Sequence, residues 1–250
     1  RAEALKGAHP SELQRHPADL DDERLATVSE GLRIITIAPE LRGAPALITR
    51  LAGAGVQVSL GHSAATVAEA RAGYSAGATT TTHLFTAMVG ITHRQPGLAL
   101  EALLDDEVWV ELIADTHHVD PELWPLIWRM KPVERVLLVS DAIALAGSSA
   151  TRGMIGELAV RVDGEQVTLV DGGNLAGSLT ALDLELRNVV RHGTSLVDAV
   201  RAAATNPAQL LGLDDRGRLA EGLRADLVEL DATSFRVLRV MRAGEWIAGA

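Results

Sequence analysis

Short apolar runs rich in β-branched residues alternate with segments of helical spacing in the first half of the chain. The runs are almost continuously apolar, which is typical of strands buried on both faces of a parallel sheet. The segments between them are rich in Ala and place apolar side chains every three or four positions, as helices packed on a sheet do. This alternation predicts an α/β fold. The runs cover residues 34–38, 56–60, 79–82, 108–114 and 136–139, and the helical segments cover residues 44–54, 66–76, 98–104 and 121–130.

The pattern changes after Gly147. Two alternating stretches flank the turn signal Asp163-Gly164 and predict a β-hairpin, inserted near residues 155–172. Two helices and a tail of three short strands are expected after it. The helices are predicted at residues 178–190 and 195–204, and the strands at residues 227–230, 237–240 and 245–247.

Composition and charge narrow the class of protein. The 250 residues are 47% hydrophobic and only 3% aromatic, so we expect a globular protein with an aliphatic core. A net charge of -10 argues against a nucleic-acid partner, which needs a clustered basic face. The chain has no Cys, so any metal must be held by His, Asp or Glu. No apolar run is long enough for a membrane span or a signal peptide, so we expect no membrane partner and a cytoplasmic location.

Carboxylates and imidazoles follow each of the five predicted strands. In chain order these residues are Glu40, His62, His83, the pair His117-His118, and Asp141. The carboxyl ends of parallel strands meet at one edge of a sheet, and ligands and catalytic groups gather there. The sequence therefore predicts an active site at this edge.

Two imidazoles on adjacent strands suit a metal. His62 and His83 leave room in a metal's coordination shell for a carboxylate and a water molecule. Asp141 could take a proton from that water and pass it to a leaving amine, or it could cap a following helix. Glu40 could serve the site or be a buried salt-bridge partner.

Three further segments could hold a ligand. Arg94 lies on the loop after the His83 strand, where a guanidinium suits a phosphate or carboxylate, although a solvated surface Arg is an equal interpretation. Residues 174–178 precede a predicted helix, so their amides could meet an anion. The segment Lys6-Gly7-Ala8-His9 is short and cationic, and it carries little information alone.

Taken in order, these segments resemble the N-acetylglucosamine-6-phosphate deacetylases, a family of the amidohydrolase superfamily. Each motif is short, but together they follow the family's order, close to its spacing, over essentially the whole chain. The matching stretches are Lys6-Gly7-Ala8-His9, Ile37-Ala38-Pro39-Glu40, Gly61-His62-Ser63, the seven residues from Thr82 to Met88, Arg94-Gln95-Pro96-Gly97, residues 115–120, Ser140-Asp141-Ala142, Leu175-Ala176-Gly177-Ser178 and Asn206-Pro207-Ala208.

The resemblance implies the barrel of a metal-dependent hydrolase. That fold is a TIM (β/α)8 barrel with a small flanking β-sandwich, and strands 4–8 of the barrel would lie in this chain. Residues 1–213 would form the C-terminal portion of the barrel, and residues 214–250 the C-terminal part of the sandwich. The family carries a Glu metal ligand in a Leu-Glu-Gly-Pro motif, and a His motif earlier still, and both would precede Arg1. We therefore expect this chain to be the C-terminal portion of a longer protein.

The resemblance also implies an activity and a role for each site residue. The reaction would be metal-dependent hydrolysis of the acetamide of N-acetylglucosamine 6-phosphate, with one or two divalent ions (Zn, or Fe, Mn or Co). His62 and His83 would bind metal, and Asp141 would be the catalytic acid and base. A homodimer is implied, in which His9 serves the neighbouring subunit's site. Substrate contacts would fall at Ala8, His9, Thr86, Ala87, Arg94, His118, Leu175, Ala176 and Gly177.

Two departures from the family pattern concern the sugar. Thr86 stands where the family usually has Asn, and a hydroxyl reaches less far than an amide. His117 adds an imidazole in a segment that usually reads Asp-Gly-Leu-His. Alternative functions are therefore a related amidohydrolase acting on N-acetylgalactosamine 6-phosphate or another amide, and a non-catalytic fragment that binds sugar phosphates.

Overall fold

Five parallel strands form the central sheet of the computed structural model, which describes residues 5–10, 14–20 and 31–247. The strands pair in sequence order, so each is hydrogen-bonded to its neighbours in the chain. In the register of the first pair, Ile34 lies opposite Gln57 and Ile37 opposite Leu60. All five lie where the sequence predicts them. They are β1 (Ile34–Ile37), β2 (Gln57–Leu60), β3 (Thr80–Thr81), β4 (Trp109–Leu112) and β5 (Val136–Leu138).

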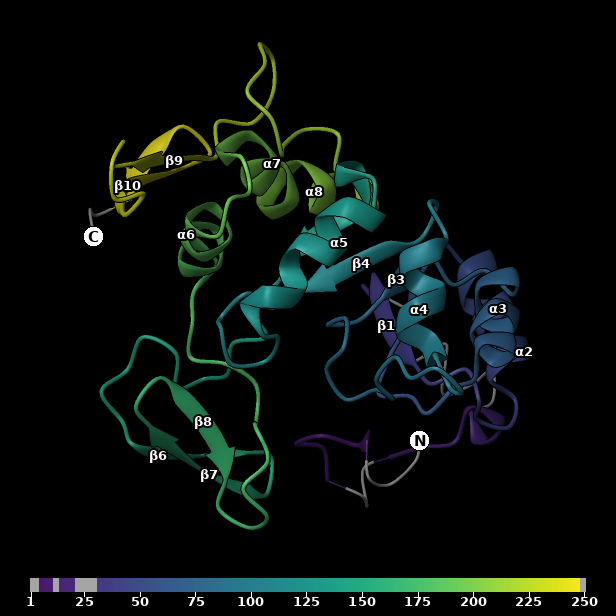
Figure 1. The fold of residues 1–250 in the computed structure, drawn as a ribbon. Helices are drawn as coiled ribbons and strands as arrows, with labels where there is room; N and C mark the ends of the chain where they lie inside the picture. The colour runs from purple at the N-terminus through teal and green to yellow at the C-terminus, as the bar shows by residue number, and fades with distance from the viewer. Residues whose placement is uncertain (1–4, 11–13, 21–30, 248–250) are drawn as a thin grey trace.

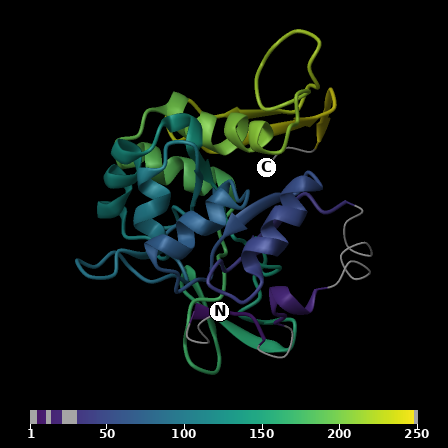
Figure 2. The same cartoon turned by 90° about the vertical axis from the view of Figure 1, so that its right-hand side faces the viewer.

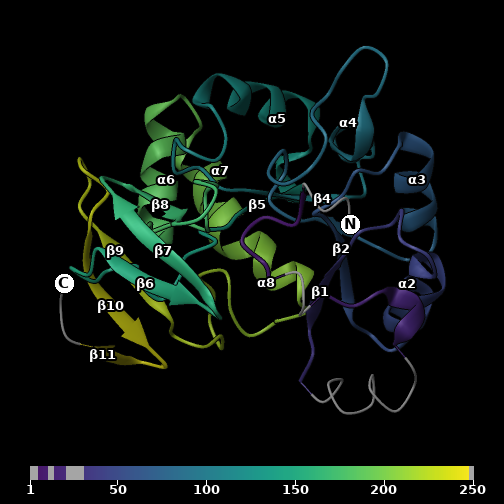
Figure 3. The same ribbon diagram turned by 90° about the horizontal axis from the view of Figure 1, so that it is seen from below.

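Helices pack on the outside of this sheet and form an arc around the strands (Figures 1 and 3). The second of them begins at a capping box, in which Thr66 and Glu69 each bind the other's backbone amide. The shared core is aliphatic, as expected, and Ile48, Leu60 and Leu112 are fully buried in it. The helices are α2 (Ala44–Gly53), α3 (Val67–Ser75), α4 (Gly97–Leu104) and α5 (Trp124–Met130), with short 3-10 turns η3 (Pro17–Asp19), η4 (Pro121–Leu123) and η5 (Val133–Arg135).

A small antiparallel sheet follows β5. Its strands β7 (Leu158–Asp163) and β8 (Gln166–Leu169) are the two arms of the predicted hairpin. The sequence reading missed a third strand, β6 (Arg152–Ile155), which pairs with β7. Gly153 lies within this strand opposite Val160, and a Cβ at that position would meet the Leu145 side chain at 2.8 Å.

The helical segment after this sheet begins later than the sequence predicts. Residue Ser178 was expected to open a helix, but it forms a parallel bridge with Ala142 instead. Helix α6 (Leu182–Arg191) therefore starts four residues further on. It is followed by α7 (Leu196–Val200), a π-helical turn η6 (Arg201–Thr205) and α8 (Asn206–Leu210).

The tail forms a separate three-stranded antiparallel sheet of β9 (Leu227–Leu230), β10 (Val237–Arg242) and β11 (Glu245–Ile247). Figures 1 and 2 show it at the opposite end of the molecule from the small sheet β6–β8. Within the described ranges, no helix has the length and apolar character needed to cross a membrane.

Candidate active site

The backbone takes a left-handed conformation where three of the parallel strands end. The φ angles are 49° at His62, 30° at His83 and 50° at Asp141. Residues with a Cβ disfavour this region by about 1–2 kcal/mol, so the surrounding structure must hold them there. Strain of this kind at three predicted site residues marks the carboxyl edge of the sheet as the functional edge.

His62 and His83 point their rings at each other. Nδ1 of His62 lies 3.0 Å from the Leu5 carbonyl oxygen, and Nδ1 of His83 lies 3.1 Å from that of Thr86. A carbonyl oxygen only accepts, so each Nδ1 carries the proton and each neutral ring presents a lone pair at Nε2. The two Nε2 atoms are 2.9 Å apart. Two lone pairs this close repel each other unless a cation lies between them.

The donor set fits a divalent metal. Two nitrogens on one tetrahedral zinc ion, each about 2.0–2.1 Å away, stand about 3.3 Å apart, close to the spacing of this pair. The carbonyls on the two Nδ1 atoms are the outer partners that orient metal-binding imidazoles. In the part of the chain that the structure describes, no group of three or more His, Asp or Glu side chains is placed to hold a metal. The chain thus offers two ligands of a larger set.

Glu111 lies beneath His83 and was missed by the sequence reading. Its Oε2 accepts from the His83 amide at 3.2 Å, and its carbonyl oxygen accepts from the Leu84 amide at 2.7 Å. Burial raises the pKa of Glu111 to about 7. Burial also lowers the pKa of His83, which keeps its imidazole neutral. An acidic residue inside the apolar run of residues 108–114 was the signal that could have identified it.

His118 and Asp115 form a buried ion pair. Asp115 Oδ2 accepts from His118 Nδ1 at 2.7 Å, and Oδ1 accepts from the amides of His117 and His118. Burial opposes the charge on His118, but the hydrogen bond and charge of Asp115 outweigh it and raise the pKa of the imidazole. The charge of Asp141 contributes to raising the pKa of both His118 and His83.

Asp141 does not cap a helix. The ten residues from 141 to 150 contain turns and no helix, so that alternative is wrong. Its carbonyl oxygen instead accepts from the Ser178 amide at 2.9 Å. Gly177 passes so close that a Cβ there would lie 2.7 Å from the same oxygen, which requires Gly at this position. Gly177 and Ser178 therefore lie directly against the Asp141 strand end, and the helix that residues 174–178 were predicted to precede begins only at Leu182.

Residues 5–10 lie beside the imidazole pair of His62 and His83. The carbonyl of Leu5 binds His62, and a Cβ on Gly7 would meet the His62 ring at 3.0 Å. Ala8 packs against the small sheet β6–β8. The ring of His9 lies 4.9 Å from that of His62 in an edge-to-face arrangement, so this imidazole reaches the site of its own chain.

The turn after His83 brings Thr86 and Ala87 to the site. The Thr86 hydroxyl is buried and has no hydrogen-bond partner among the described residues, so it is available to a ligand. Ala87 has a φ of 49°, and its carbonyl oxygen accepts from the Ser63 amide. Arg94 lies further along on an exposed loop, and among the described residues its side chain makes no hydrogen bond or ion pair. The structure does not bring Arg94 to the imidazole pair.

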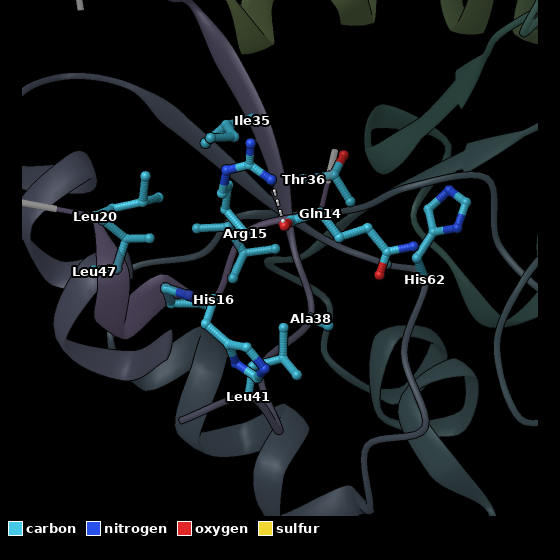
Figure 4. A pocket seen from close by; sticks show the side chains of 13 residues that line it. Gln14, Arg15, His16, Leu20, Ile35, Thr36, Ala38, Leu41, Leu47 and His62 are labelled. Atoms are coloured by element: carbon cyan, nitrogen blue, oxygen red, sulfur yellow. Dashed lines mark hydrogen bonds between the residues drawn. The ribbon is translucent and has the colours of Figure 1, made fainter. Parts of the chain in front are cut away.

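Glu40 braces the loop that carries His62. Its two carboxylate oxygens accept from the Ser63 hydroxyl and the Ala64 amide, both at 2.7 Å. Among the described residues these two hydrogen bonds are its side-chain contacts, and the salt-bridge interpretation stays a prediction. A cavity of about 470 Å³ lies between β1 and residues 14–17. Figure 4 shows the side chains that line it, with His62 at one side.

Several known proteins are similar to this chain in sequence and fold. One curated relative is the N-acetylgalactosamine-6-phosphate deacetylase of Escherichia coli O157:H7, which is 40% identical over 91% of this chain and 60% of that protein. Another is the N-acetylglucosamine-6-phosphate deacetylase of Bos taurus, which is 36% identical over 97% of this chain and 61% of that protein. The chain thus spans about 60% of the length of these relatives. A Mycobacterium smegmatis N-acetyl-D-glucosamine-6-phosphate deacetylase in complex with N-acetyl-D-glucosamine-6-phosphate superposes with a TM-score of 0.91, at 40% identity over 97% of this chain and 65% of that one.

These likenesses confirm the predicted fold, a partial TIM barrel with a flanking antiparallel sheet. The family model of the amidohydrolases matches residues 9–247, which is nearly the whole chain. The chain belongs to the amidohydrolase family.

Proposed function

We propose that the protein hydrolyses the acetamide of N-acetylglucosamine 6-phosphate to glucosamine 6-phosphate and acetate. The observation that carries this proposal is that Nε2 of His62 and Nε2 of His83 face each other 2.9 Å apart, near the charge of Asp141. The pair suits a metal, and the carboxylate suits proton transfer to and from a reacting amide. Deacetylases of amino-sugar phosphates among the relatives support the substrate class.

His62 and His83 are the residues that would hold the metal, whose contribution is Lewis-acid polarisation of a water molecule and of the amide carbonyl. Asp141 takes a proton from the attacking water and gives it to the amine nitrogen as the C–N bond breaks. His118 is held by Asp115 through Nδ1, so its protonated ring donates from Nε2 to the developing oxyanion. The raised pKa of His118 favours this protonated form.

The substrate's phosphate is assigned to the turn after β3. The unpartnered Thr86 hydroxyl and the Ala87 amide would donate to it, and Arg94 would add a charge-assisted hydrogen bond. Ala8, Leu175, Ala176 and Gly177 would line the sugar. We also propose a homodimer in which His9 contributes to the active site of the neighbouring subunit. The alternative is that His9 serves the site of its own chain, where its ring lies beside that of His62.

We assign zinc as the metal, with iron, manganese and cobalt as alternatives, and one or two ions. Among the described residues, this proposal assigns two metal ligands, His62 and His83. We assign residues 1–213 to the barrel and 214–250 to the flanking β domain. The cytoplasm is the proposed location, since a charged sugar phosphate crosses a bilayer poorly.

A second candidate substrate is N-acetylgalactosamine 6-phosphate. The relative with 40% identity acts on this sugar by name, and Thr86 and His117 both depart from the pattern of the glucosamine family. The two sugars differ in the orientation of one hydroxyl, so a small change in the side chains lining the sugar decides between them.

The test is acetate release by the complete protein from both 6-phosphates and from their unphosphorylated forms. We expect release from a 6-phosphate, its loss on chelation, and its return with zinc. His83→Gln should lower zinc affinity by more than the roughly 10–100-fold cost of losing an outer-shell partner, measured by metal analysis. Release that survives chelation, or equal rates on unphosphorylated sugars, would contradict the proposal.

A further inference from the structure

The turn between β7 and β8 lies against the loop that follows β4, which we call the β4 loop (residues 113–120). His117 is the residue of this loop that meets the turn. Gln166 Nε2 donates to His117 Nδ1 at 3.1 Å, and Glu165 Oε2 lies 3.6 Å from His117 Nε2. The His117 side chain is 21% exposed and that of Glu165 is 83% exposed. A largely buried imidazole is thus held by two residues of an exposed turn.

Both ring nitrogens of His117 are directed at the turn. Nδ1 accepts from the Gln166 amide nitrogen, so Nε2 carries the proton of the neutral ring. Among the described residues this buried Nε2 has no hydrogen-bond partner, and it faces the Glu165 carboxylate. The carboxylate therefore attracts it. With the Gln166 amide turned over, its oxygen would accept from Nδ1 of a doubly protonated ring, so the contact survives either protonation state.

The β4 loop is a firm support for this contact. Asp115 Oδ1 accepts from the amides of His117 and His118, each at 2.9 Å, and Oδ2 accepts from His118 Nδ1 at 2.7 Å. Asp115 is itself only 5% exposed. One buried carboxylate therefore fixes both imidazole-bearing residues, and the turn is the part that His117 positions.

Strand β8 carries the segment that lies against Asp141. The Val167 carbonyl oxygen accepts from the Ala176 amide at 3.0 Å, and both residues are buried in the core of the small sheet. Gly177 comes next, and a Cβ there would lie 2.7 Å from the Asp141 carbonyl oxygen. Gln166 directly precedes Val167, so its contact with the β4 loop also restrains this edge of the small sheet.

We propose that His117 is a positioning residue, which ties the β7–β8 turn to the β4 loop and thereby sets the position of residues 175–177 relative to His118. The proposed function assigns the oxyanion donor to His118 and the sugar contacts to residues 175–177. The kinetic consequence of this inference rests on that function, whereas the tie itself rests on the contacts alone. His117 acts through β8, and it is not a catalytic residue.

Loss of the tie should weaken substrate binding more than it slows the chemical step, because Asp115 still holds His118. Gln166→Ala removes the hydrogen bond at an exposed residue, so the fold should persist. With the complete protein and whichever 6-phosphate it cleaves, we expect KM to rise about three- to tenfold and kcat to stay within about twofold. His117→Ala should have the same effect. An unchanged KM in both folded variants would overturn the proposal.

A double-variant cycle separates the tie from two unrelated structural effects. Once His117→Ala has removed the contact, adding Gln166→Ala should raise KM little further. If the two changes in log KM simply add, the two side chains act independently and the proposal is wrong.

A matched control is Glu157→Ala, in the exposed turn at the other end of β7. It perturbs the same small sheet without touching the β4 loop, so we expect KM to stay at the wild-type value. A rise as large as that of Gln166→Ala would mean that any disturbance of the sheet weakens binding, and would contradict a specific tie.

Hydrogen exchange of the backbone amides in residues 163–168 measures the tie without activity. We expect His117→Ala and Gln166→Ala to speed exchange there by about three- to tenfold and to leave residues 152–158 unchanged. Wild-type exchange rates in both variants would overturn the tie, even if the protein releases acetate. If no acetate is released but both variants loosen the turn, the proposed function fails while the tie stands.

Discussion

The two ends of the five-stranded sheet differ in which residues adopt the left-handed backbone conformation. At the amino end, the turns after α2 and α3 use Gly55 and Gly77, with φ angles of 80° and 117°. At the carboxyl end, Gly43 and Gly177 also take this region, but residues with side chains take it as well. Eight described non-glycine residues have a positive φ, and six of them lie at this end, among them His62, His83 and Asp141. The chain places strain where the proposed chemistry is, and avoids it where only folding is at stake.

Charge is also treated differently at the two ends. At the amino end, Lys131 is 4% exposed and donates from Nζ to the carbonyl oxygens of Ala102 and Asp105, at the end of α4. This cation satisfies carbonyls that a helix leaves unpaired. At the carboxyl end, His62 and His83 turn two lone pairs toward each other. One end thus completes its hydrogen bonds within the fold, and the other keeps unsatisfied groups for a ligand.

The largest expected effect comes from Asp141→Asn at the carboxyl end. The amide cannot carry the proton, so we expect kcat to fall by about 10²- to 10⁴-fold. Asn tolerates the left-handed backbone as well as Asp does, so the melting temperature and zinc content should stay near wild type. Acetate release, calorimetry and metal analysis test this together. Asp120→Asn, an exposed cap of η4, is the matched control and should keep full activity. Near-normal turnover in the Asp141 variant would remove its assigned role.

The second prediction concerns Lys131→Met at the amino end. Burial lowers the Lys131 pKa from 10.5 to about 8. The unfolded chain then binds more protons than the folded one between these values, so wild-type stability should rise from about pH 8 to 10.5 by roughly 3 kcal/mol relative to the variant. Urea unfolding across this range measures the difference. We expect kcat at neutral pH to be unchanged. If the free energies of unfolding of wild type and variant change with pH in the same way, the lowered pKa of Lys131 is contradicted.

The smallest effect is expected from Ala87→Gly, which relieves a φ of 49° while keeping the backbone amide. Relief of about 1–2 kcal/mol is partly offset by the greater entropy of the unfolded chain, leaving a gain of about 0.5–1 kcal/mol. Ala72→Gly, at an exposed helical position of α3, should instead cost about 1 kcal/mol. Equilibrium unfolding of both variants gives the signs. Equal losses in the two would mean that the carboxyl end stores no strain.

The sequence predicted the parallel sheet because its strands are buried on both faces and therefore read as apolar runs. It also predicted which residues follow each strand, because chain order alone decides that. His62 and His83 could be paired in advance, since consecutive strands β2 and β3 are neighbours in a parallel sheet.

Local patterns failed where long-range contacts decided the structure. Ser178 has the composition of a helix start, but its hydroxyl and amide are taken by the carbonyls of Ser140 and Asp141. Glu40 accepts hydrogen bonds from the loop of the next strand, which no local pattern predicted. Glu185 is fully buried, although no feature of the surrounding sequence distinguishes it from an exposed helical Glu.

The sequence by itself determined the order of elements, the aliphatic core and the His and Asp residues at the strand ends, because these depend on periodicity and chain order. Only the tertiary structure decided that the two imidazoles face each other through Nε2, because the carbonyls of Leu5 and Thr86 set their tautomers. It alone decided that the buried Glu185 carboxyl group accepts from the Thr180 hydroxyl and from the Ala114 amide. Such contacts join segments far apart in the chain, and no local pattern of residues encodes them.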